Sequence, residues 1–221
     1  MEGTARSFLG DIQSAVAGLP WGAGEASGAD KKNHTERLSH RFSAIIARHL
    51  GQAGLQDVKA PSGGPDKSFV GGYGPKGVDV YLSDERHGLL LTSGVKGLLF
   101  DPGKNLKNRY RDMVMEALEL HKRFPYAVCG HFFFIGKTEA SRGSKKFGTV
   151  LGEAVALLQN IADRKRPDEA PELYEAMGIM VMDPGDSASV DLAPSVVPEH
   201  LQAATYCQRL VHIFQHRNPF F

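Results

Sequence analysis

The sequence predicts an α/β fold built around a mixed sheet. Its 221 residues, 42% of them hydrophobic, suffice for one sizeable core. Segments with helical spacing alternate with short apolar runs, and the run at 127–136 (AVCGHFFFIG) is typical of a strand buried on both faces. The expected order is helix, three strands, helix and strand, followed by a helix-strand-helix extension.

The first 32 residues are expected to form an N-terminal arm or linker. A short helix near 7–17 precedes the stretch GLPWGAGEASGADKK, whose Gly and small residues are typical of flexible segments. A single α/β domain is expected over 33–221. Its first helix presents an apolar face that includes Leu38 and Phe42, and Gly51 or Gly54 ends it.

Three strands are expected next, at 68–73, 78–82 and 88–96. The polar turn SDERHG joins the last two. The helix that follows, at about 105–123, carries an apolar stripe and ends before Pro125. The extension comprises a helix near 147–163, a strand at 176–183 and a helix near 198–216.

The net charge of +1 hides a basic middle segment. Residues 31–150 hold 20 Lys or Arg against 11 Asp or Glu, a net charge of +9, while both flanking segments are acidic. Such a segment could bind a phosphate backbone, although the solvated surface of an ordinary enzyme can carry the same excess of basic residues. Charge alone therefore leaves nucleic-acid binding open.

Several classes of protein are not indicated. Cys129 and Cys207 have no CxxC spacing, which argues against a disulfide framework and a thiolate zinc site. The sequence contains neither an apolar run of membrane-spanning length nor a secretory signal pattern, so a cytoplasmic protein without a membrane partner is expected. Gly-rich stretches lack the P-loop ending, which argues against nucleotide hydrolysis.

Four histidines are weak candidates for metal ligands. His212 and His216 have the i, i+4 spacing of a zinc pair, but no Glu follows His212, and a solvated or aromatic-packed pair is the preferred interpretation. His121 and His131 lie at a helix end and in an apolar strand. For both we expect a hydrogen-bonded role in the core.

Two charged residues stand in neighbouring predicted strands, Asp79 in one and Lys96 in the next. Phosphodiester cleavage needs a divalent cation held by carboxylate oxygens and often uses a lysine near the attacking water. Strand register decides whether the two side chains share a face. Pairing of Asp79 with Leu91 separates them, whereas pairing with Thr92 brings them together, and the sequence permits both.

The segment 33–137 resembles the PD-(D/E)xK nuclease superfamily, the restriction-endonuclease-like fold, through Asp79, Lys96 and the order helix, three strands, helix, strand. The resemblance implies an Mg²⁺ cofactor, with Mn²⁺ as an alternative, bound by Asp79, and a DNA substrate cut by an enzyme of type II restriction endonuclease character. Such enzymes commonly act as homodimers. Two departures stand out: Gly94 replaces the acidic residue two before the lysine, and no proline precedes Asp79.

Some restriction enzymes of this superfamily carry the missing acid on the following helix. Asp112 and Glu116 stand on that helix at i and i+4 and so share a face, and Glu116 is the preferred replacement. Glu36 on the first helix is a third candidate, because related nucleases often hold an extra metal-linked acid there. The competing interpretation of each is a solvated carboxylate paired with a neighbouring cation, such as Arg109.

Two basic clusters flank the predicted site and are candidate DNA contacts. Cations at a helix N-terminus are unfavourable because of the helix dipole, so their clustering there suggests a function such as phosphate binding. A merely solvated helix face is an equally weighted interpretation. The first cluster begins the helix after Lys96 and the second follows the strand 127–136. The candidate residues are Lys104, Lys107, Arg109 and Arg111 in the first and Arg142, Lys145 and Lys146 in the second.

The predicted function is therefore an Mg²⁺-dependent DNA endonuclease, with Asp79, Lys96 and Glu116 as catalytic residues and Glu36 and Asp112 as further metal candidates. The alternative is a DNA-binding module of the same fold that lacks catalysis, for which Gly94 is the main indication. A small-molecule enzyme or interaction domain with an incidental basic patch is a third option.

Overall fold

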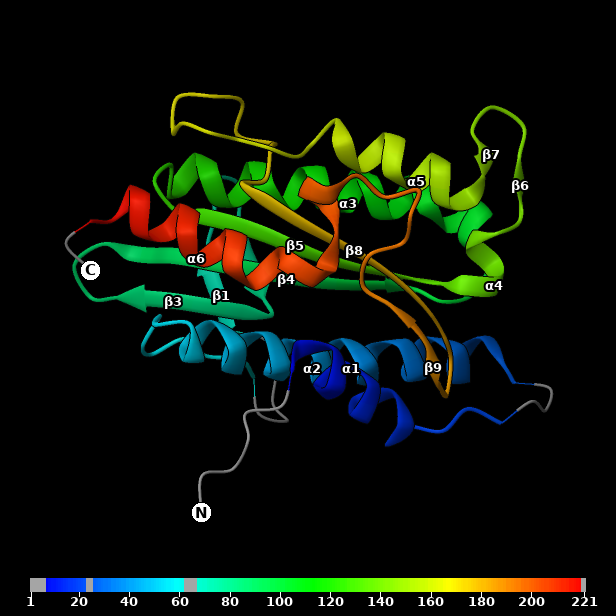
Figure 1. Ribbon diagram of the computed structural model, residues 1–221. Helices are drawn as coiled ribbons and strands as arrows, with labels where there is room; N and C mark the ends of the chain where they lie inside the picture. Colours follow the sequence, from blue (N-terminus) through cyan, green and yellow to red (C-terminus); the bar gives the residue numbers. More distant parts are fainter. Residues whose placement is uncertain (1–6, 23–25, 62–66, 220–221) are drawn as a thin grey trace, which may run out of the picture.

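The computed structural model describes residues 7–22, 26–61 and 67–219 (Figure 1). Within this part of the chain the main sheet has five strands in the order β3 (Val80–Asp84), β4 (Gly88–Leu98), β5 (Val128–Gly136), β8 (Ala176–Asp183) and β9 (Asp186–Asp191). Strands β4, β5 and β8 are parallel, and the two edge strands run antiparallel to their neighbours. The predicted α/β class with a mixed sheet is confirmed.

Helices cover both faces of this sheet (Figure 1). One core joins it to α1 (Phe8–Ala17), α2 (Gly28–Gln52) and α6 (Tyr206–Arg217), and the other to α3 (Pro102–Arg123) and α5 (Val150–Gln159). Strand β5 alternates between the two cores, since Phe132 belongs to the first and Phe133 to the second. All nine of its residues are buried, as the apolar run predicted.

Helix α2 begins at Gly28, five residues before the predicted start of the domain at Asn33. A capping box explains the difference: the Ser27 hydroxyl accepts from Asp30 N–H, and the Asp30 carboxylate accepts from Ser27 N–H. The sequence places residues 1–32 outside the compact domain. In the structure, however, Ile12 and Val16 of α1 are fully buried in the same core as α2, while residues 1–6 and 23–25 lie outside the described part.

The predicted strands at 68–73 and 78–82 form differently from expectation. A hairpin of β1 (Lys67–Val70) and β2 (Pro75–Val78) makes a small sheet of its own, and the chain continues through Asp79 directly into β3. The β3–β4 ladder reaches only to Ser93, because β2 departs from the sheet to pair with β1. The edge of β4 beyond Ser93 is therefore not covered by β3.

The C-terminal extension is more broken than predicted. A short helix α4 (Lys137–Ala140) and a small hairpin of β6 (Gly143–Ser144) and β7 (Gly148–Thr149) precede α5. The last helix begins at Tyr206, after 3-10 turns at Glu199–Leu201 and Ala203–Thr205. The sequence pattern does not predict β9, because DSASVD is polar at its start and short. No helix in the described residues is long and apolar enough to cross a membrane.

Candidate active site

Asp79 and Lys96 lie near each other where the β3–β4 ladder ends, since the Asp79 carboxylate contributes to the raised pKa of Lys96. Val80 pairs with Ser93, so extending the ladder by one residue sets Asp79 opposite Gly94. Neither register considered from the sequence is correct, because the turn centres on Arg86 and a bulge between Leu82 and Ser83 shifts the pairing further. Gly94 and Lys96, which are two apart on β4, share a face.

Asp79 sits where the chain passes from β2 to β3. Its Oδ2 accepts a hydrogen bond of 2.7 Å from the backbone N–H of Val95. This bond satisfies a donor on the part of β4 that β3 does not reach. The Asp79 carboxylate therefore closes the ladder at the point where the small hairpin leaves the sheet.

The buried side chain of Glu116 fills the space above Gly94. A Cβ on Gly94 would lie 2.5 Å from Glu116 Oε1, far closer than packed atoms approach. Glu116 belongs to the buried face of α3 together with Met113, Ala117 and Leu120. The helix thus delivers a carboxylate to the position that a side chain on residue 94 would otherwise occupy.

Two lysines bind the Glu116 carboxylate. Lys96 Nζ lies 3.2 Å and Lys76 Nζ 3.3 Å from Glu116 Oε2. Burial alone would raise the pKa of Glu116, but the ammonium groups of Lys96 and Lys76 outweigh it and hold that pKa below its ordinary value. Sequence reasoning missed Lys76. This residue lies two positions before Val78 in β2, and the alternation of side chains along a strand is the pattern that could have placed it in the site.

Lys96 is a permanent cation in this arrangement. Burial by itself lowers the pKa of Lys96, but the Glu116 and Asp79 carboxylates outweigh it and raise that pKa above its ordinary value. An ammonium group donates hydrogen bonds and accepts none. Lys96 can therefore orient a water or a phosphate oxygen but does not act as a general base.

His131 on β5 is the second side chain that sequence reasoning did not assign to the site. It pairs with Gly94 in the β4–β5 ladder, and its Nδ1 lies 3.8 Å from Glu116 Oε1. The prediction of a hydrogen-bonded core histidine is wrong here, because neither ring nitrogen has a hydrogen-bond partner among the described residues. Burial lowers the pKa of His131 to about 3, so the ring is neutral near pH 7.

The other two candidate metal ligands, Asp112 and Glu36, are exposed carboxylates in ion pairs. Asp112 lies 3.6 Å from Arg109, and Glu36 lies 3.6 Å from Lys32. Both line a cleft of about 470 Å³ between α2, α3 and the end of β4. Asp112 stands one helical turn before Glu116, but neither Glu116 nor Lys96 is among the residues that line this cleft.

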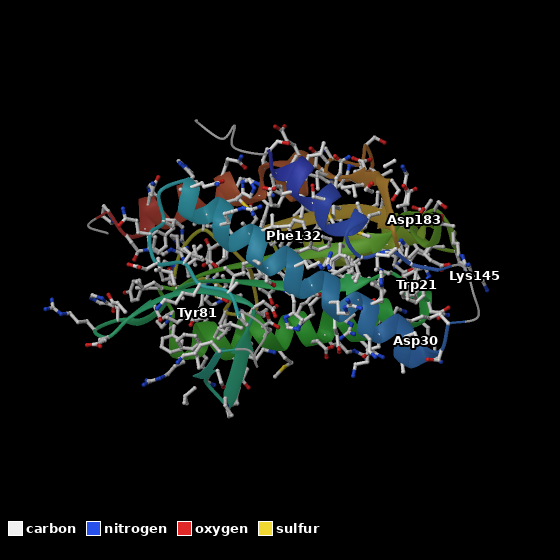
Figure 2. The ribbon with its side chains drawn as sticks, turned by 90° about the horizontal axis from the view of Figure 1, so that it is seen from below. Trp21, Asp30, Tyr81, Phe132, Lys145 and Asp183 are labelled. Atoms are coloured by element: carbon white, nitrogen blue, oxygen red, sulfur yellow. The ribbon has the colours of Figure 1, made fainter. Side chains whose placement is uncertain are left out.

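The predicted DNA contacts are exposed and gather near the carboxyl ends of the parallel strands. The four α3 residues all lie in the first half of the helix, and the second cluster lies around the β6–β7 hairpin (Figure 1). Figure 2 shows Lys145 at the same end of the molecule as Asp30, in the first turn of α2, and Asp183, the last residue of β8. Arg142 is partly neutralised by Glu139, 2.6 Å away.

A separate buried group of His121, Cys129 and Glu175 has ligand atoms within 4.8 Å of one another. Both His121 nitrogens face acceptors, since Nδ1 donates to the Pro171 carbonyl and Nε2 contacts the Glu175 carboxylate. Burial opposes a charged ring, but Cys129 and Glu175 outweigh it and raise the pKa of His121 to about 10. An imidazolium has no lone pair for a metal, so this group is a structural ion network, which Arg164 completes.

No protein-family model, curated protein or solved structure gives a significant match to this chain.

Proposed function

We propose that the protein is a metal-dependent DNA endonuclease with a restriction-endonuclease-like core. The observation that carries this proposal is the Glu116 carboxylate, which occupies the space above Gly94 beside Lys96. It supplies the acid that the strand lacks. Among the described residues, four strands lie between α2 and α3, and two of them, β3 and β4, belong to the main sheet with β5. This order resembles the helix, three strands, helix and strand expected of that core.

In this proposal Asp79 and Glu116 would hold a divalent cation. Their side chains would supply carboxylate oxygens, which Mg²⁺ and Mn²⁺ prefer. When bound, the ion would activate water and neutralise charge on the scissile phosphate. Asp112 and Glu36, on the walls of the cleft, remain further candidates for an outer contact.

Lys96 and Lys76 then have defined roles toward the substrate. Both ammonium groups are held at Glu116, and the Lys96 and Lys76 side chains are 24% and 29% exposed, so a phosphate at the surface would meet them. Lys96 orients the attacking water or a phosphate oxygen by donating hydrogen bonds. Lys76 adds positive charge where negative charge develops.

DNA is the proposed partner because cations line the approach to this site. The first α3 cluster borders the cleft through Arg109, and Lys31 and Lys32 of α2 line its opposite wall. Phosphate contacts of this kind position a duplex without reading its sequence. The second cluster, around the β6–β7 hairpin, would contact the duplex farther along its backbone.

The direct test is cleavage of plasmid and genomic DNA with Mg²⁺, Mn²⁺ or EDTA. We expect metal-dependent cleavage that is abolished by Lys96→Met and by Asp79→Asn, while DNA binding persists. The asparagine side chain would still accept the Val95 N–H, so the second substitution removes charge and keeps the fold. Lys165→Ala and Asp84→Asn, which change a distant lysine and an acid at the other end of β3, are the matched controls.

Full activity in Lys96→Met or Asp79→Asn would remove the proposed mechanism. If the wild-type protein binds DNA and never cleaves it, the alternative stands: a DNA-binding module of the same fold without catalysis.

A further inference from the structure

We propose that the tip of the β6–β7 hairpin, residues 145–147, is a wedge that enters the minor groove of duplex DNA and inserts the Phe147 ring between two base pairs. Lys145 and Lys146 would contact the phosphates beside the inserted ring. This inference rests on the proposed DNA-directed function and deepens it, because it assigns one element of the fold to the distortion of the substrate.

Phe147 differs in exposure from the other phenylalanines of the described residues. All of those are buried or half-buried, whereas Phe147 is 37% exposed and belongs to neither hydrophobic core. An apolar ring gains free energy when it leaves water, and every base offers a flat aromatic face on which it can stack. The ring at the hairpin tip is therefore available to a base stack.

The surroundings of Phe147 are basic. Segment 137–149 holds four basic residues against a single acid, Glu139, which Arg142 contacts at 2.6 Å. Lys146 Nζ stands 5.4 Å from the centre of the Phe147 ring. Such a contact between exposed groups is weak, so the ring can exchange it for a base stack. A polyanion with stacked bases is therefore the partner that matches this tip.

The base of the hairpin is fixed to α5, which holds the tip in place. Ser144 Oγ donates a hydrogen bond of 2.9 Å to the Glu153 carboxylate of α5, and the Val150 N–H donates to the Arg142 carbonyl at 2.9 Å. Thr149 ends β7 and is also the N-cap of α5. A wedge that is preorganised in this way loses little conformational entropy when it enters DNA.

The length of the hairpin decides which groove it fits. Strands β6 and β7 have two residues each, about 7 Å, too short for a two-stranded ribbon that lies along the major groove and reads base edges. The three-residue turn is then the part that reaches DNA, and apolar wedges of this kind enter the minor groove and kink the duplex. Figure 1 shows this turn as the part of the hairpin farthest from the main sheet, at the end of the molecule where the parallel strands stop.

The test is binding of the full chain, in EDTA, to a short duplex that carries 2-aminopurine next to a single mismatch. This base fluoresces more strongly when it is unstacked. A mismatch lowers the cost of unstacking, so it places the wedge at a known step. We expect the fluorescence to rise on binding, and the mismatched duplex to bind more tightly than the matched one.

Phe147→Ala should remove the fluorescence rise and the preference for the mismatch, and should weaken binding about tenfold, as expected for the loss of one base stack. Its salt dependence should not change. Replacing both Lys145 and Lys146 with alanine should instead reduce the slope of log affinity against log salt by about 1–2, while the fluorescence rise persists. Phe147→Trp should keep the rise. Tyr126→Ala, at an exposed aromatic residue near the other end of β5, should behave as the wild type.

Three outcomes would overturn the inference. The first is a wild-type protein that binds the duplex without unstacking the labelled base, which decides the question even if Phe147→Ala does not fold. The second is a fluorescence rise that survives Phe147→Ala. The third is binding to anionic phospholipid vesicles that depends on Phe147 while DNA binding does not, which would assign the tip to a lipid surface. Unstacking without any cleavage would refute the nuclease and leave the wedge in place, whereas metal-dependent cleavage without unstacking would refute the wedge alone.

Discussion

Replacing Gly94 with alanine tests whether the site depends on the fit between this glycine and the Glu116 carboxylate. The added Cβ would lie 2.5 Å from Glu116 Oε1 and 2.7 Å from His131 Nδ1. Carbon atoms pack best at about 3.5–4.0 Å, so one of the two groups must move by about 1 Å. His131 is fixed in the central strand β5, and two ammonium groups hold Glu116.

We therefore expect Gly94→Ala to lower the free energy of unfolding by about 1–3 kcal/mol, the usual cost of overpacking a core. For a chain of this size that corresponds to a fall in Tm of about 2–12 °C. Urea unfolding and calorimetry measure both quantities. The substitution should also abolish metal-dependent cleavage, because the carboxylate is displaced from Lys96.

Gly103→Ala is the matched control. Gly103 lies in the first turn of α3, and a Cβ there would meet nothing within 4 Å. Alanine in a helix is favoured over glycine by about 0.5–1 kcal/mol, so this variant should be neutral or more stable. If Gly94→Ala unfolds with the same free energy as the wild type, the close approach of Glu116 to the strand is refuted.

Three further predictions follow from the same structure. Charge reversal at Lys107 and Arg109 should weaken duplex binding and reduce its salt dependence between about 50 and 200 mM; unchanged affinity would place the contact elsewhere. Glu116→Gln leaves Lys96 without its carboxylate partner and should cost about 1–3 kcal/mol in urea unfolding, since the pair is only partly desolvated. The pKa of His121 is raised from 6.5 to about 10, so its stabilising contribution is present below about pH 6.5 and declines as the pH rises to 10. The loss of stability over that range should be smaller in His121→Gln, and an unchanged pH profile would contradict the assignment.

Local pattern was enough to predict most of the core elements. The continuous apolar run of β5 indicates burial on both faces, and the helical spacing of α3 indicates its buried stripe. The resemblance suggested a carboxylate from this helix near the strands, and the structure places Glu116 on the buried face with Met113 and Leu120. These features depend on residues close together in the chain, where the period of the backbone decides which side chains share a face.

The composition of the site was decided by tertiary structure. The place of Asp79 beside β4 depends on a bulge between Leu82 and Ser83 that no residue type predicts. The place of Lys76 depends on the departure of β2 from the sheet to pair with β1.

His131 is the clearest example of a residue whose surroundings the sequence could not predict. The sequence by itself determined that this residue lies in a buried strand, and a buried histidine is ordinarily hydrogen-bonded. Only the packing of α3 over Gly94 decided that a carboxylate would stop 3.8 Å from the ring, beyond hydrogen-bond distance. That distance depends on contacts between β4, β5 and α3, which a pattern local to any one of them does not encode.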